Sequence, residues 1–153
     1  MRPKKVILCV DADEQRLSRR VFLLETRGYR VLRAASGAAA LKVLHNSLPL
    51  AIDLLLTDLI LLDMAGNELV RRTKRMHPEM RTIITSDTVS SFDPASTADV
   101  FLPSSTNTAE LLERIRILMV RKRGPRKMSP TAIAAVHASK VYQALAAQEA
   151  ACA

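Results

Sequence analysis

The chain has 153 residues, of which 48% are apolar, and a formal net charge of +8. This length and composition suit one domain of ordinary size with some chain left over. The apolar run at residues 6–10 is too short for a signal peptide or a membrane span, which predicts a cytoplasmic protein with no membrane partner. The two cysteines and three histidines lack partners at ligand spacing, so neither a disulfide framework nor a zinc site is expected.

Most of the excess positive charge lies at the C-terminal end. Residues 1–120 hold 17 Lys and Arg against 14 Asp and Glu, whereas residues 121–153 hold 6 against 1. The stretch 121–129, RKRGPRKMS, is predicted to be a basic linker, because no aromatic residues accompany its charges as in many nucleic-acid-binding surfaces. Nucleic acid is therefore an unfavoured partner. Residues 130–153 are predicted to form an alanine-rich helical tail that starts at Pro130.

Strand and helix patterns alternate along residues 1–120. Apolar runs that suit buried strands occupy 5–10, 29–34, 52–57, 81–85 and 100–102. Helical patterns occupy 13–27, 36–44, 66–75 and a last segment opened by Asn107 and Glu110. The segment 86–98 is rich in Ser, Thr, Asp and Pro, so the fourth helix is predicted to be short or irregular. The alternation predicts a doubly wound α/β fold with a five-stranded parallel sheet.

Polar residues follow the predicted strands at one edge of this sheet. In the strand order 2-1-3-4-5, ligands bind at the carboxyl ends of strands one and three. Asp11 ends strand one and Asp58 ends strand three, while Thr85 ends strand four and Ser104 follows strand five. Two neighbouring carboxylates repel each other, and Mg²⁺ would relieve that repulsion and leave Asp58 able to accept a phosphoryl group. A turn-capping role explains Asp58 equally well.

These residues resemble the receiver domain of bacterial two-component response regulators, over about residues 4–120. The resemblance rests on VILCVDADE, on LLLTDLILLDMAGNEL around Asp58, on TIITS and on VFLPSS. It implies a flavodoxin-like fold in which Asp58 accepts phosphate from a histidine kinase or phosphotransfer protein. It also implies that Asp11, Asp58 and the backbone carbonyl of Ile60 hold Mg²⁺. Thr85 would contact the phosphoryl group, and Phe101 would change orientation with it.

The sequence departs from the family pattern at several site positions. Ala12 stands where a second acid usually follows the first, and alternation in an extended chain is expected to point Asp13 elsewhere. Ser104 takes the catalytic position of the lysine that neutralises the phosphoryl group, and Leu62 replaces a proline. These departures imply weak binding of Mg²⁺ and leave efficient phosphorylation of Asp58 open.

Two functions of different classes remain open for a receiver-like domain over residues 1–120. In the first, a single-domain response regulator of a phosphorelay is switched at Asp58 and signals by docking a downstream protein, with no enzymatic activity of its own. In the second, the receiver has become independent of phosphate and acts as a constitutive protein-interaction module. The sequence identifies neither the kinase nor the downstream target.

Overall fold

The computed structural model of the chain describes residues 3–47, 51–88 and 96–120. All of them belong to one unit of the chain, Met1–Arg121. The predicted basic linker at 121–129 and the predicted helical tail at 130–153 lie outside the described residues. Both therefore stay predictions.

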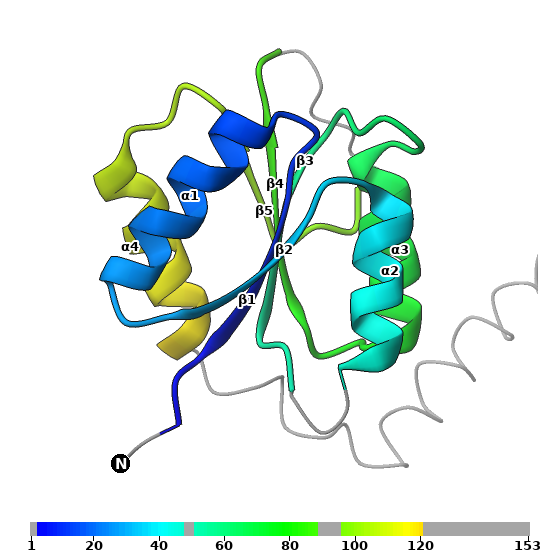
Figure 1. The fold of residues 1–153 in the computed structure, drawn as a ribbon, viewed down its shortest axis with the longest axis horizontal. Helices are drawn as coiled ribbons and strands as arrows, with labels where there is room; N and C mark the ends of the chain where they lie inside the picture. The colour runs from blue at the N-terminus through cyan, green and yellow to red at the C-terminus, as the bar shows by residue number, and fades with distance from the viewer. Residues whose placement is uncertain (1–2, 48–50, 89–95, 121–153) are drawn as a thin grey trace, which may run out of the picture. The chain divides into compact units, whose positions relative to one another are not determined.

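A parallel sheet forms the centre of this unit (Figure 1). Its strands are β1 (Val6–Val10), β2 (Arg30–Ala34), β3 (Leu54–Asp58), β4 (Arg81–Ser86) and β5 (Val100–Pro103). The strands lie in the order β2-β1-β3-β4-β5, which confirms the predicted doubly wound, flavodoxin-like fold. Every residue of β1 and β3 is buried, because helices cover both faces of the sheet; this explains the continuous apolar runs in their sequences.

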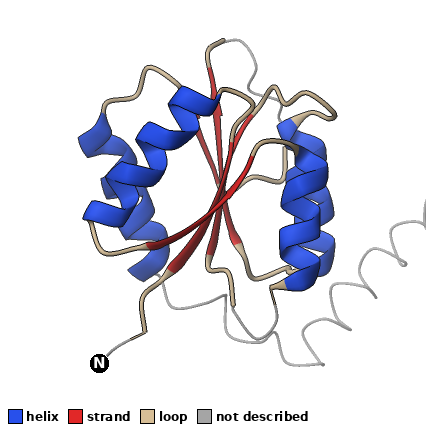
Figure 2. Ribbon diagram, viewed as in Figure 1, coloured by secondary structure: helices blue, strands red, loops and turns tan. Residues whose placement is uncertain are grey.

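The described helices lie on both faces of the sheet. They are α1 (Glu14–Thr26), α2 (Gly37–Asn46), α3 (Gly66–Met76) and α4 (Thr108–Val120). Figure 2 shows α1 and α4 on one face and α2 and α3 on the other. Successive residues of β1 point to opposite faces, so that Leu8 packs in the core cluster on the α2 and α3 side and Cys9 in the cluster on the α1 and α4 side.

Polar side chains cap the starts of the first two helices. Asp13 caps α1 by accepting hydrogen bonds from the backbone N–H groups of Gln15 and Arg16, and Ser36 caps α2. The sequence also predicts a short or irregular helix between β4 and β5, at residues 86–98. Of this segment, residues 86–88 and 96–98 are described and contain no helix, whereas residues 89–95 lie outside the described part. Among the helices that the structure describes, none has the length and apolar character needed to cross a membrane.

Candidate functional site

Three of the predicted site residues meet at the carboxyl edge of the sheet. Val10 of β1 pairs with Thr57 of β3, so the residues that follow them, Asp11 and Asp58, lie beside each other. Asp58 in turn pairs with Thr85 of β4, whose Oγ1 lies 3.5 Å from the Asp58 Oδ1. Asp11 is fully buried and Asp58 is 5% exposed. The sheet therefore gathers these side chains as the strand order predicts.

The Asp11 carboxylate is saturated by hydrogen bonds. Its Oδ1 accepts from the backbone N–H of Asp13 at 2.9 Å and from Arg16 Nη2 at 3.1 Å. Its Oδ2 accepts from Arg16 Nε at 2.7 Å and from Arg20 Nη1 at 3.2 Å. A carboxylate offers about four acceptor positions, so α1 and its N-terminal turn take up the whole group.

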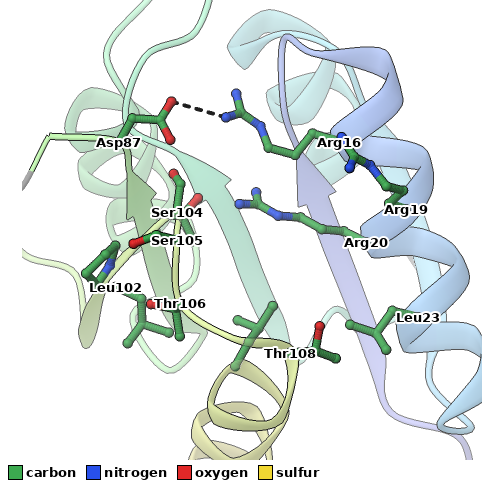
Figure 3. A pocket seen from close by; sticks show the side chains of 13 residues that line it. Arg16, Arg19, Arg20, Leu23, Asp87, Leu102, Ser104, Ser105, Thr106 and Thr108 are labelled. Carbon is green, nitrogen blue, oxygen red and sulfur yellow. Dashed lines mark hydrogen bonds and ion pairs between the residues drawn. The ribbon is translucent and has the colours of Figure 1, made fainter.

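Arg16 connects Asp11 to two further carboxylates. Its Nη2 lies 3.3 Å from the Asp58 Oδ2. Its Nη1 lies 3.3 Å from the Asp87 Oδ2, the contact marked by a dashed line in Figure 3. The hydrogen bonds to Asp11 raise the pKa of the Arg16 guanidinium above its ordinary value. A planar guanidinium with five donors can contact several carboxylates at once. Arg16 thus supplies the positive charge between the two strand-end acids.

Burial raises the pKa of the Asp58 carboxyl above its ordinary value of 3.8. The nearby Arg16 opposes this shift, whereas the negative charge of Asp11 adds to it. Desolvation prevails over the favourable ion pair. The ionised form of Asp58 is therefore less favourable in the folded protein than in an unfolded chain.

The donor groups do not fit the Mg²⁺ ion that the resemblance implies. The Asp11 carboxylate is hydrogen-bonded to Arg16 and Arg20. The Asp13 carboxylate instead accepts hydrogen bonds from backbone N–H groups at the start of α1. Hydrogen bonds from the backbone N–H groups of α1, chiefly that of Arg16, lower the pKa of Asp13. Within residues 3–47, 51–88 and 96–120, no cluster of three or more acidic, His or Cys side chains is placed to hold a metal. A ligand role for the Ile60 carbonyl stays a prediction.

Ser104 lies after β5, where its backbone N–H donates to the carbonyl of Ser86 at 2.7 Å. Its Oγ is buried and has no hydrogen-bond partner among the described residues. Helix α1 brings the guanidinium groups of Arg16 and Arg20 to the site. The cationic side chains of the site thus come from a different element of the fold.

Backbone contacts fix the β3–α3 loop from the other side of the site. A Cβ added to Gly66 would lie 2.3 Å from the backbone oxygen of Asp58, so only glycine allows this approach. The Asp63 carboxylate accepts hydrogen bonds from the backbone N–H groups of Gly37 and Ala38 at 2.9 and 2.7 Å. These bonds lower the pKa of Asp63 and tie the loop to the start of α2.

Apolar side chains are exposed on the same loop. Ile60 is 69% exposed and Leu62 is 84% exposed, so both side chains are accessible to a partner protein. Phe101 of β5 packs, partly buried, against the core cluster on the α2 and α3 side. Its predicted change of orientation stays a prediction.

The sequence alone did not reveal the role of the two arginines. Arg16 and Arg20 are four residues apart and therefore lie on one face of α1, directly after the acid that ends β1. This spacing is the signal that was available. The contacts of Asp63 with α2 and of Asp87 with Arg16 join residues far apart in the chain, and no local pattern predicted them.

The profile of the response regulator receiver domain matches residues 7–116. The chain belongs to this family. The sensor kinase CckA of Brucella abortus is 29% identical over 121 residues, and the transcriptional regulatory protein CpxR of Escherichia coli K12 is 32% identical over 120 residues. The matches cover 76% and 75% of this chain but only 13% and 49% of those proteins. The chain therefore spans half or less of the length of these relatives.

Solved receiver structures show the same fold. A CheY-like receiver domain protein from Methanospirillum hungatei is 30% identical, with a TM-score of 0.70 over 76% of this chain and 94% of that one. The receiver domain of the hybrid histidine kinase CckA is 28% identical, with a TM-score of 0.65 over 74% of this chain and 98% of that one. The described unit is thus a receiver domain of two-component signalling.

Proposed function

We propose that this receiver domain docks signalling partners without metal-dependent phosphorylation of Asp58. The supporting observation is the position of Arg16, which contacts Asp11, Asp58 and Asp87 together. An internal cation thus already neutralises the acids on which a metal ion would depend. Of the two functions left open by the sequence, this geometry favours the constitutive interaction module.

Ionic contacts oppose the release of Asp58 from Arg16. At 3.3 Å, the attraction between the two charged groups is roughly 5 kcal/mol at an effective dielectric near 20, before desolvation is subtracted. Arg16 also makes two hydrogen bonds to the fully buried Asp11, so its displacement by a metal ion would break several charge-assisted contacts. Ala12 and Ser104 provide no replacement ligand or cation.

The partners that we propose are a histidine kinase or a phosphotransfer protein, because a sensor kinase and a transcriptional regulator are among the relatives of this chain. The exposed Ile60 and Leu62 beside Asp58 offer apolar contact area for such a protein. Phe22 on α1 is 70% exposed and offers more. We place this docking in the cytoplasm, where the sequence predicts the protein to be.

A second candidate function is the phosphorelay step itself, with Asp58 as the phosphoacceptor. The proximity of the Thr85 hydroxyl to Asp58 favours it, because a hydroxyl at 3.5 Å from the carboxylate is placed to contact a group carried there. In this case the guanidinium of Arg16 would neutralise the phosphoryl charge. Output would again proceed through protein docking.

Incubation of the full chain with acetyl phosphate and Mg²⁺, followed by intact mass measurement, distinguishes the two candidates. The wild type and Asp58→Asn are compared, with Arg16→Met as a third sample. We expect the wild type to gain no more phosphoryl mass than Asp58→Asn. A phosphoryl adduct that forms in the wild type and is absent from Asp58→Asn would establish the phosphorelay function instead.

A further inference from the structure

A pocket of about 500 Å³ lies between α1 and the loop from β5 to α4 (Figure 3). The side chains of Arg16, Arg19 and Arg20 line it from α1. Hydroxyl-bearing residues line it from the opposite side, among them Ser105 and Thr108. Pockets of this size accommodate small organic ligands. The charge and hydrogen-bonding groups of the wall then indicate which class of ligand fits.

The pocket has an excess of positive charge. Its acidic lining residue is Asp87, which is paired with Arg16. Arg20 is 9% exposed and donates to Asp11 through Nη1; its other N–H groups have no partner among the described residues. Among the described residues, Arg19 donates a single hydrogen bond, from Nε to the backbone oxygen of Gln15 at 3.4 Å. Guanidinium donors that line a pocket and have no protein partner there favour an anion.

Apolar side chains form the rest of the wall. Leu23 contributes from α1, Leu102 from β5 and Leu111 from α4. A bare inorganic anion would leave these groups without contact, whereas a ligand with both a phosphate and an apolar part would use the whole pocket. Arg19 and Arg20 are suited to the phosphate because guanidinium groups bind phosphate oxygens with paired hydrogen bonds.

We propose that this pocket binds a small organic phosphate, with its phosphate on Arg19 and Arg20 and its apolar part against Leu23 and Leu102. Asp58 does not line the pocket, but Arg16, Thr85 and Ser104 of the receiver site do, so the pocket adjoins the phosphoacceptor position. It is also linked to the receiver site, since the Arg20 that faces the pocket also holds Asp11. A phosphate bound by Arg20 would compete with Asp11 for this guanidinium, so ligand binding is expected to weaken the Arg20–Asp11 ion pair.

Calorimetric titration of the full chain with ADP tests this proposal, with adenosine and pyrophosphate as comparison probes. We expect ADP to bind and adenosine, which lacks phosphate, to bind at least about tenfold more weakly, since charge-assisted hydrogen bonds to phosphate are lost. Pyrophosphate is expected to bind more weakly than ADP because it makes no apolar contact. Equal affinity for pyrophosphate and ADP would overturn the organic part of the proposal.

Two matched variants test the location of the site. Arg19→Gln removes an exposed cation that lines the pocket, and Arg33→Gln removes an exposed cation of β2 that does not. ADP affinity should fall about tenfold in the first variant and stay unchanged in the second. Equal losses in both, or no binding of ADP to the wild type at millimolar concentration, would overturn the proposal. The ADP titration requires neither phosphorylation of Asp58 nor a protein partner, so its outcome can be told apart from that of the acetyl phosphate experiment.

Discussion

The two sides of the carboxyl edge of the sheet are held by different kinds of contact. On the α1 side, Arg16 and Arg20 bind the carboxylates of Asp11 and Asp58 through charged side chains. On the α2 side, the β3–α3 loop is held by the close backbone approach at Gly66 and by hydrogen bonds from backbone N–H groups to the Asp63 carboxylate. The α2-side contacts thus hold the loop, while the arginines set the charge of the site.

Substitutions on the two sides are therefore expected to have different effects. A substitution on the α1 side should change the charge of the site and leave the β3–α3 loop in place. A substitution on the α2 side should displace this loop. The predictions that follow separate these two effects by comparing variants from each side.

The largest effect is expected for Arg16→Met. This variant leaves Asp11 with Arg20 as its single cationic partner and leaves Asp58 without one among the described residues. Removal of one partner from a buried ion pair is strongly destabilising, and we expect the free energy of unfolding to fall by about 3 kcal/mol. Urea denaturation measures it. Arg19→Met, on the exposed side of the same helix, should change stability by less than about 0.5 kcal/mol; equal losses would contradict the account.

A smaller loss is expected for Gly66→Ala on the α2 side. The new Cβ would lie 2.3 Å from the Asp58 backbone oxygen, so the loop must shift, at a cost of about 2 kcal/mol. The matched control is Gly28→Ala, which meets no atom within 4 Å but has a φ of 89°. Its left-handed backbone should cost about 1 kcal/mol. Thermal and urea unfolding of both variants would show the clash account to be wrong if Gly28→Ala were the more damaging change.

Asp63→Ala should lower the free energy of unfolding by less than Gly66→Ala does, because two N–H groups at the start of α2 lose their acceptor. The folded-state pKa of Asp63 is lowered, so its stabilising contribution is present above its ordinary value of 3.8 and is lost as the pH falls through the lowered value. The gap between variant and wild type should therefore close in acid. A gap that is independent of pH would show that the charge of Asp63 has no part in the effect.

The smallest effect, and one of opposite sign, is expected for Asp58→Asn. The pKa of Asp58 is raised in the folded state, because ionisation of this carboxyl costs more free energy there than in the unfolded chain. The free energy of unfolding is therefore highest below the ordinary pKa of 3.8, where Asp58 is protonated in both states. It falls as the pH rises from 3.8 through the raised pKa. The neutral Asn avoids this loss. Its thermal midpoint should slightly exceed that of the wild type at neutral pH, and the difference should vanish below the ordinary pKa. A variant that is less stable at neutral pH would mean that the pair with Arg16 outweighs desolvation.

Local patterns in the sequence were sufficient to predict the sheet and the strand-end residues. Asp11, Asp58 and Thr85 end buried strands, and parallel strands bring their ends to one edge whatever the intervening sequence. The contacts of Arg16 were not predictable in the same way, because a long side chain reaches partners that depend on how α1 lies on the sheet. The tie between Asp63 and Gly37 spans 26 residues and likewise requires the folded structure.

The predicted Mg²⁺ site rests on the repulsion between Asp11 and Asp58, which a metal ion would relieve. The structure places the guanidinium of Arg16 beside both acids. Binding of Mg²⁺ stays a prediction. A guanidinium from an adjacent helix and a divalent cation solve the same electrostatic problem, and only the position of the side chain distinguishes them.

Titration of the full chain with Mg²⁺ at fixed ionic strength, compared between wild type, Arg16→Met and Arg19→Met, tests the role of Arg16 most directly. The account predicts that the wild type and Arg19→Met show no saturable binding at millimolar Mg²⁺. Arg16→Met, confirmed as folded by circular dichroism, should bind Mg²⁺ at least about tenfold more tightly, because Asp11 and Asp58 then lack the guanidinium between them. Saturable binding of Mg²⁺ to the wild type with an affinity equal to that of Arg16→Met would contradict the claim that Arg16 stands in place of the metal.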